Sequence, residues 1–159
     1  MQSIRQPTWR DLLTLLLGYV VLDWASYFHS LHELNITPWN PAPALGLIYL
    51  LRFGGVAFLP LALAIFLADA WVRHLPVSFM VSAGLSVLLA AGYWLIAALL
   101  RRRLSTGAIF SDQRGLLEWA VIVVVGTLLN SAFYVATLRF CNLIPGSSVQ
   151  DAFIRYWVG

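Results

Sequence analysis

The chain has 159 residues, of which 60% are hydrophobic and only 11% are charged. Because globular domains carry about 25% charged residues, this composition excludes a soluble globule and is typical of an integral membrane protein. All ten basic residues are arginines, and the net charge is +3. The arginines gather at the ends of apolar runs. This pattern indicates topology signals and contacts with anionic lipid headgroups, and it does not indicate nucleic acid binding. A single cysteine, Cys141, excludes an intrachain disulfide.

The first predicted element is a membrane span over residues 9–28. Arg5 and Arg10 precede it, and since cytoplasmic flanks are rich in arginine, they place the N-terminus in the cytoplasm. No small-residue cleavage site follows the apolar run, so we interpret it as a retained span and not as a signal peptide. The polar segment from His29 to Thr37 contains no Lys or Arg, and we expect it outside.

The stretch from Pro38 to Asp69 decides the topology of everything that follows it. As a single span it would place Arg52 near the bilayer centre, at a cost of about 2.5–3.5 kcal/mol. It would also leave the triplet Arg101–Arg103 outside, against the usual bias. We therefore predict a hairpin of two short helices with a tight cytoplasmic turn at residues 52–55. Both helices are shorter than the roughly 20 residues of a full span.

The remaining apolar runs complete a single-domain bundle. We expect residues 105–115 in the cytoplasm and residues 139–151 outside. The chain stops soon after a new apolar and aromatic stretch begins, so we expect it to be truncated at its C-terminus. The predicted fold is an all-α polytopic transmembrane helical bundle with five spans, the start of a sixth, and a cytoplasmic N-terminus. The spans are predicted at residues 9–28, 38–52, 56–72, 77–100, 116–138 and 152–159 onward.

Several short pieces of the sequence match a family pattern. They are Pro38-Trp39-Asn40-Pro41, Gly46-Leu47, Gly54, Pro60, Ala68-Asp69 and Arg155-Tyr156-Trp157-Val158-Gly159. In this order, over residues 9–159, the chain resembles the bacterial membrane-associated sensor domain of the first type. That domain is a multi-span input module found ahead of histidine kinase, diguanylate cyclase and phosphodiesterase domains.

The resemblance implies a sensory input domain of a bacterial signalling protein, foremost a two-component sensor histidine kinase. It implies a place in the bacterial inner membrane, a cytoplasmic signalling domain in cis, and a homodimer, with no enzymatic activity in this region itself. It identifies neither the stimulus nor a cofactor. Two alternatives stay open. One is a small transporter or channel fragment in which Asp23 and Asp69 relay protons or ions, and the other is an accessory subunit of a membrane complex.

Ionisable residues inside membrane segments are costly, which makes them functional candidates by default. Asp23 is expected near the outer end of the first span and Asp69 near the outer end of the third. Trp39 and Asn40 precede the prolines that start the second helix, with Asn40 as its N-cap, and the N-terminus of that helix can meet an anion or Asp23. These four are the candidate ligand-binding residues. A structural role for the carboxylates stays open, because Arg73 follows Asp69 at the spacing of a helical ion pair.

A metal site is a weaker hypothesis. His29, His32 and Glu33 offer nitrogen and oxygen ligands in one outer segment, and His74 lies in the next outer turn. Such a site requires these side chains to converge, while ordinary solvated residues give the same pattern.

Small polar residues in the later spans predict helix contacts. Ser82, Ser86 and Ala90 recur at a spacing of four, which marks a close contact between helices. Asn130 lies deep in the fifth span and favours an interhelical hydrogen bond. The sequence contains no glycine-rich phosphate loop, zinc-protease motif or serine nucleophile elbow, so no cofactor is predicted from motifs.

Overall fold

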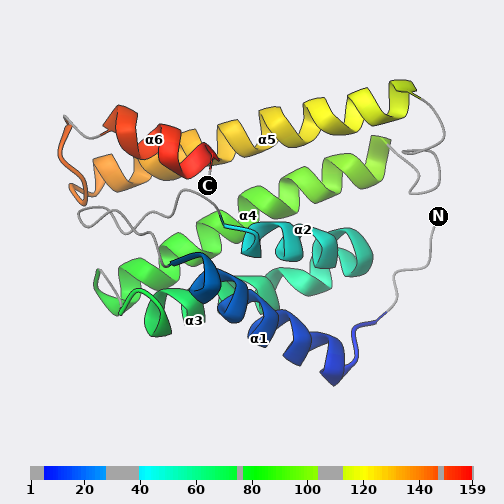
Figure 1. The fold of residues 1–159 in the computed structure, drawn as a ribbon, viewed down its shortest axis with the longest axis horizontal. Helices are drawn as coiled ribbons and strands as arrows, with labels where there is room; N and C mark the ends of the chain where they lie inside the picture. Colours follow the sequence, from blue (N-terminus) through cyan, green and yellow to red (C-terminus); the bar gives the residue numbers. More distant parts are fainter. Residues whose placement is uncertain (1–5, 28–39, 75–76, 104–112, 147–148, 159) are drawn as a thin grey trace.

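The computed structural model describes residues 6–27, 40–74, 77–103, 113–146 and 149–158, and every regular element in these ranges is helical (Figure 1). The predicted all-α fold is therefore confirmed for the described residues. In chain order the elements are α1 (Trp9–Ser26), α2 (Ala42–Phe53), the 3-10 helix η2 (Gly54–Ala57), α3 (Phe58–Trp71), α4 (Phe79–Arg103), α5 (Gln113–Phe140) and α6 (Val149–Val158).

Helix α1 begins with a capping box. The Thr8 hydroxyl accepts a hydrogen bond from the Asp11 backbone N–H at 3.3 Å, and the Asp11 carboxylate accepts one from the Thr8 N–H at 2.9 Å. The two residues thus satisfy donors that a helix N-terminus leaves unpaired, and the negative charge of Asp11 suits the positive end of the helix dipole. This fixes the start of the helix that carries Asp23.

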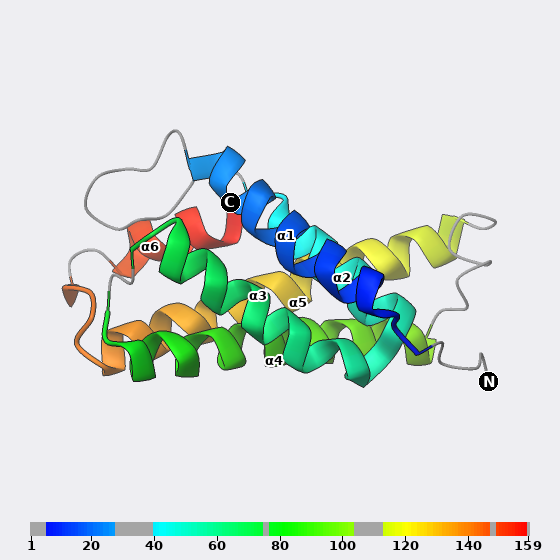
Figure 2. The same ribbon diagram turned by 90° about the horizontal axis from the view of Figure 1, so that it is seen from below.

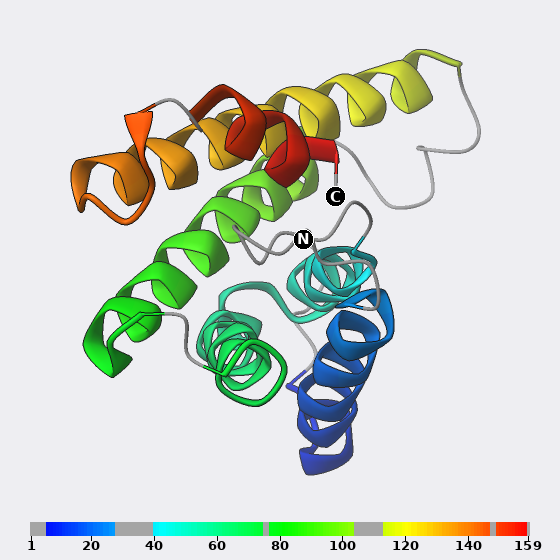
Figure 3. The same ribbon diagram turned by 60° about the vertical axis from the view of Figure 1, so that its left-hand side comes forward.

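The chain reverses direction between α2 and α3. Gly54 adopts a φ of 64°, which ends α2, and η2 then leads into α3. Figures 1 and 3 show α3 running back beside α2, and Gly46 of α2 lies directly against Leu61 of α3. The predicted turn is shifted, because α2 continues through Phe53 and the reversal falls in the 3-10 helix. Arg52 therefore lies in the last turn of α2.

Among the residues that the structure describes, three helical stretches are long and apolar enough to cross a membrane. They are Ala42–Trp71, α4 and α5, with mean hydropathies of 2.1, 2.0 and 2.0. The first contains the reversal at Gly54, so its two helices have 12 and 14 residues. The predicted number of spans and the cytoplasmic N-terminus stay predictions.

The buried core lies where α3 packs against α1 and α4, with α2 resting on α1 and α4. The fully buried side chains here include Leu15, Leu50, Phe53 and Leu61. The predicted contact stripe Ser82, Ser86 and Ala90 is also buried, at 1% exposure or less. Helix α5 packs on α4 and α6 and exposes apolar side chains on its other side, namely Val121, Val125, Leu129 and Phe133. These exposed side chains form an outward apolar face of the kind that lipid covers.

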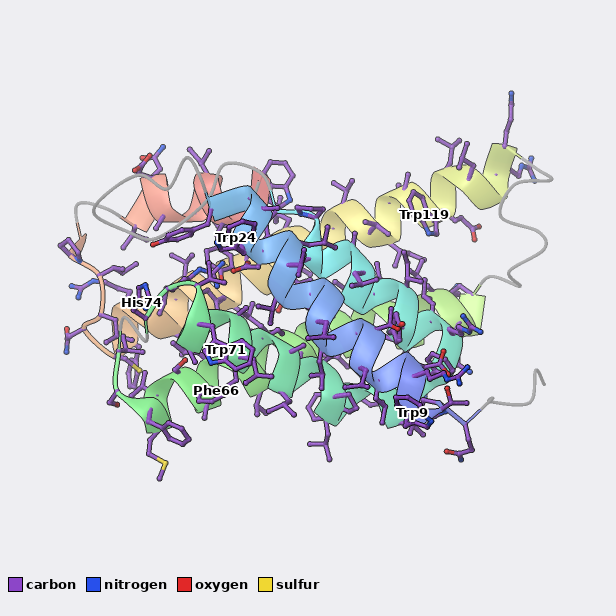
Figure 4. All side chains as sticks on the ribbon, turned by 60° about the horizontal axis from the view of Figure 1, so that its bottom comes forward. Trp9, Trp24, Phe66, Trp71, His74 and Trp119 are labelled. Carbon is purple, nitrogen blue, oxygen red and sulfur yellow. The ribbon has the colours of Figure 1, made fainter. Side chains whose placement is uncertain are left out.

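Four of the seven tryptophans can be placed toward the two ends of the bundle. Figure 4 shows Trp9 and Trp119 toward one end, and Trp24 and Trp71 toward the other. Trp9, Trp24 and Trp71 are more than half exposed. Exposed tryptophans at both ends of an apolar bundle are typical of the two interfacial belts of a membrane protein.

Candidate functional site

A buried polar network joins α1, α3, α4 and the start of α2. At its centre is Asp23, in the last turns of α1, which is only 1% exposed. Its Oδ1 accepts a hydrogen bond from Asn40 Nδ2 at 2.6 Å and an ionic hydrogen bond from Arg73 Nη2 at 2.8 Å. Asn40 precedes α2 and Arg73 follows α3, so a single carboxylate oxygen ties both ends of the α2–α3 hairpin to α1.

Arg73 bridges two carboxylates. Its Nη1 donates to Asp69 Oδ1 at 2.7 Å, which confirms the predicted helical ion pair. Ser82 of α4 donates to the other oxygen of Asp69 at 3.1 Å, so the network extends to α4. Burial alone would lower the pKa of Arg73, but the charges of Asp23 and Asp69 outweigh it, and the pKa is raised. The guanidinium therefore stays charged within the network.

Asn40 uses both ends of its side-chain amide. Its Nδ2 donates to Asp23, and its Oδ1 accepts the backbone N–H of Ala42 at 2.9 Å. The backbone N-cap of α2 is Pro41, so the prediction of Asn40 as the N-cap is wrong by one residue. The side chain nonetheless satisfies an N–H that the helix N-terminus would leave unpaired, as the prediction required. Helix α2 thus begins at the same side chain that contacts Asp23.

The second carboxylate oxygen of Asp23, Oδ2, differs from Oδ1 in its hydrogen bonding. Asp23 Oδ2 is buried and has no hydrogen-bond partner within the described residues. Among the described residues the network holds two carboxylates and one guanidinium, which leaves one negative charge in excess. A buried charged acceptor without a partner is costly, so this oxygen is the place where an added donor or cation would gain most.

Three tyrosines lie close enough to the network to feel its charges. Tyr19 lies one helical turn before Asp23 and is buried. The rings of Tyr134 of α5 and Tyr156 of α6 lie against each other, with centroids 4.4 Å apart and planes tilted by 31°. All three lie within electrostatic reach of Arg73 and Asp69.

No sequence motif marks these tyrosines as site residues. The spacing of four between Tyr19 and Asp23 was the one available signal, because it places both side chains on one face of α1. Nothing in the sequence brings Tyr134 and Tyr156 to that face, since this depends on how α5 and α6 pack.

The other predicted residues divide into two groups. Trp39, His29, His32 and Glu33 lie outside the described residues, so their part in a ligand or metal site stays a prediction. His74 is described: it is exposed, has a φ of 55°, and lies near Trp71 in Figure 4. Among the residues that the structure describes, no group of three or more His, Cys, Asp or Glu side chains is placed to hold a metal ion.

Comparisons of the chain with protein-family models, with curated proteins and with solved structures gave no match. The resemblance to the membrane-associated sensor domain therefore stays a prediction. Of the four candidate ligand residues, the structure brings together Asp23, Asn40 and Asp69, with Arg73 between the two carboxylates.

Proposed function

We propose that this chain is a membrane-embedded sensory input domain of a bacterial signalling protein, foremost a sensor histidine kinase. The observation that carries the proposal is Asp23, a buried carboxylate that holds both ends of the α2–α3 hairpin and keeps one oxygen unpaired among the described residues. The family resemblance supports the sensory character. In this proposal the chain crosses the inner membrane several times, with a cytoplasmic N-terminus, and signals as a homodimer to a cytoplasmic domain.

The network suits a two-state response. A donor or cation bound at Asp23 Oδ2 would compete with Arg73 for the carboxylate, and Arg73 would shift toward Asp69. The end of α3 would then separate from α1. Because α3 begins directly after η2 at the other end of the bundle, the shift would reach the opposite side of the membrane. A ligand acts in this way only if it binds one of the two arrangements more tightly than the other.

The same unpaired oxygen favours one second candidate, a transporter or channel fragment. The excess negative charge of the network suits a cation, and Asp23 and Asp69 would relay it. The two functions differ in what Asp23 controls, which is an output domain in the first and a flux in the second.

The proposal is tested in the whole protein that the gene encodes. We expect the coding sequence after codon 159 to continue through further spans into a soluble signalling domain, and a stop codon directly after Gly159 would contradict the sensory function. We expect Asp23→Asn to change the basal output by about fivefold or more, in line with typical coupling free energies. Glu118→Gln, which removes an exposed carboxylate from α5, is the matched control and should leave the output unchanged.

Flux measurements separate the second candidate. Proteoliposomes that contain the protein are expected to show no cation flux above that of empty vesicles. A cation flux that the wild type supports and that Asp23→Asn abolishes would contradict the sensory function and support transport.

A further inference from the structure

A pocket of about 200 Å³ lies at the other end of the bundle from the Asp23 network. It is formed by α2, the glycines of η2 and the last turns of α4, and it is lined by Leu50, Gly54, Gly55, Trp94, Ala97, Ala98, Arg101 and Arg102. For comparison, a protein cavity of about 150 Å³ holds a benzene molecule. The pocket exists because two successive glycines place no side chain there, and the indole nitrogen of Trp94 stands 3.5 Å from where a Cβ of Gly55 would lie.

The pocket is polar on one side only. Leu50 and Ala97 are buried and give it an apolar floor. Arg101 and Arg102 line its other side, and neither has an ion-pair partner in the part of the chain that the structure describes. No acidic residue is among the lining residues. The pocket therefore offers two positive charges, neither of them paired among the described residues, above an apolar surface.

The position of the pocket indicates what fills it. Helix α4 is one of the apolar stretches long enough to cross a membrane, and it ends in the arginine triplet 101–103. Arginines that end such a helix lie at the level of the lipid headgroups, and basic pockets between membrane helices bind anionic headgroups. Leu95 and Leu99 on the same turns of α4 are exposed, so the apolar surface continues beside the pocket.

We propose that this pocket binds the phosphate group of an anionic phospholipid, with Arg101 and Arg102 as the phosphate ligands and Trp94 and the apolar floor against the upper part of an acyl chain. The inference rests on the membrane placement proposed above and not on the sensory role. A free phosphate ion would satisfy the arginines but would leave the apolar floor uncovered, which is why the lipid is the favoured source of the phosphate.

The test is a titration of the detergent-purified protein with phosphatidylglycerol or phosphatidylcholine, with bound lipid counted by native mass spectrometry. We expect tighter binding of phosphatidylglycerol, and a loss of about fivefold or more in Arg102→Gln. Arg103→Gln removes the same charge from the next residue, which does not line the pocket, and should bind almost like the wild type. Equal losses in the two variants would overturn the pocket in favour of general surface charge.

Two further arms complete the test. Gly55→Leu keeps every charge but fills the pocket, and we expect it to lose the bound lipid. Ala98→Leu fills the pocket from α4, and this variant is used instead of Gly55→Leu if Gly55→Leu does not fold. Retained binding in the folded variant would overturn the proposal. Inorganic phosphate at millimolar concentration should not displace the lipid, and displacement would assign the site to a free anion instead.

Discussion

Asp23 distributes its hydrogen bonds unevenly, and this sets how the network responds to mutation. One oxygen holds Asn40 and Arg73, and the other has no partner within the described residues. Removing Asp23 leaves the balanced pair of Asp69 and Arg73. Removing Arg73 leaves two neighbouring carboxylates with no cation beside them in the described part of the chain. The arginine is therefore the member on which the stability of the network depends most.

We expect Arg73→Gln to destabilise the protein more than Asp23→Asn. Breaking a buried ion pair so that a charge stays uncompensated costs about 3–5 kcal/mol. Asp23→Asn keeps a hydrogen-bond acceptor, removes the excess charge, and should cost about 1–2 kcal/mol. The measurement is the thermal unfolding midpoint in one mild detergent, followed by circular dichroism. The double variant should cost less than the sum of the two single variants, because the residues are in contact. A larger loss for Asp23→Asn would contradict this account of the charges.

Local spacing predicts only part of the network. The pair of Asp69 and Arg73 follows from a separation of four residues on a helix. The contact between Asp23 and Arg73 joins residues 50 positions apart, and it exists only because the hairpin returns the chain to α1. Ser82 was predicted as a small residue at a helix contact, which is confirmed, but its hydrogen bond to Asp69 depends on the rotation of α4.

At the scale of the elements, the reversal between α2 and α3 depends on one backbone conformation. Gly54 has φ 64° and ψ −144°, a combination that residues with a Cβ rarely adopt. We expect Gly54→Ala to destabilise the protein by about 1–3 kcal/mol. Gly55→Ala is the matched control, because the added Cβ would meet Trp94 at an ordinary contact distance. Thermal unfolding of both variants checks the prediction, and equal midpoints would show that the conformation of Gly54 does not limit stability.

The packing of α4 on α5 depends on a second glycine. A Cβ at Gly92 of α4 would overlap with the side-chain amide of Asn130 of α5. We expect Gly92→Ala to lower stability, because overpacking typically costs about 1–3 kcal/mol. Gly84, two turns earlier on the same helix, has open space at its Cβ, and Gly84→Ala should be neutral or stabilising by up to about 1 kcal/mol. The same unfolding measurement compares them, and a Gly92→Ala variant as stable as Gly84→Ala would exclude this contact.

The sequence predicted the elements better than their ends. Apolar runs and arginine positions were enough to predict the reversal near Gly54. The fifth span was expected to start at residue 116, and the helix that contains it begins at Gln113, since Gln and Arg are good helix formers although they are polar. The prediction of Asn40 as an N-cap missed by one residue, because the first backbone hydrogen bonds of α2, from Ala44 and Leu45, are accepted by the carbonyl of Pro41. Such ends depend on backbone details that hydrophobic patterns do not contain.

At the scale of the molecule, the arginines are distributed unequally between the two ends of the bundle. Figure 2 shows the start of α1, η2, the end of α4 and the start of α5 toward one end, and the ends of α3 and α5 toward the other. The first group of ends carries Arg10, Arg52, Arg101–Arg103 and Arg114, and the second carries Arg73 and Arg139. This distribution agrees with the positive-inside bias if the first end faces the cytoplasm. Cys141 then lies outside, directly after α5.

Labelling with a membrane-impermeant maleimide tests this orientation. Cys141 is exposed, so the native protein should be labelled in intact cells whose outer membrane has been removed. Gly55 is also exposed, and Gly55→Cys in a Cys141→Ser background should be labelled only after the inner membrane is permeabilised. A single span over residues 42–71 would reverse the first result, because one crossing fewer places Cys141 inside, and it would bury position 55 in lipid. Labelling of both positions from the same side would therefore exclude the hairpin as a pair of membrane crossings.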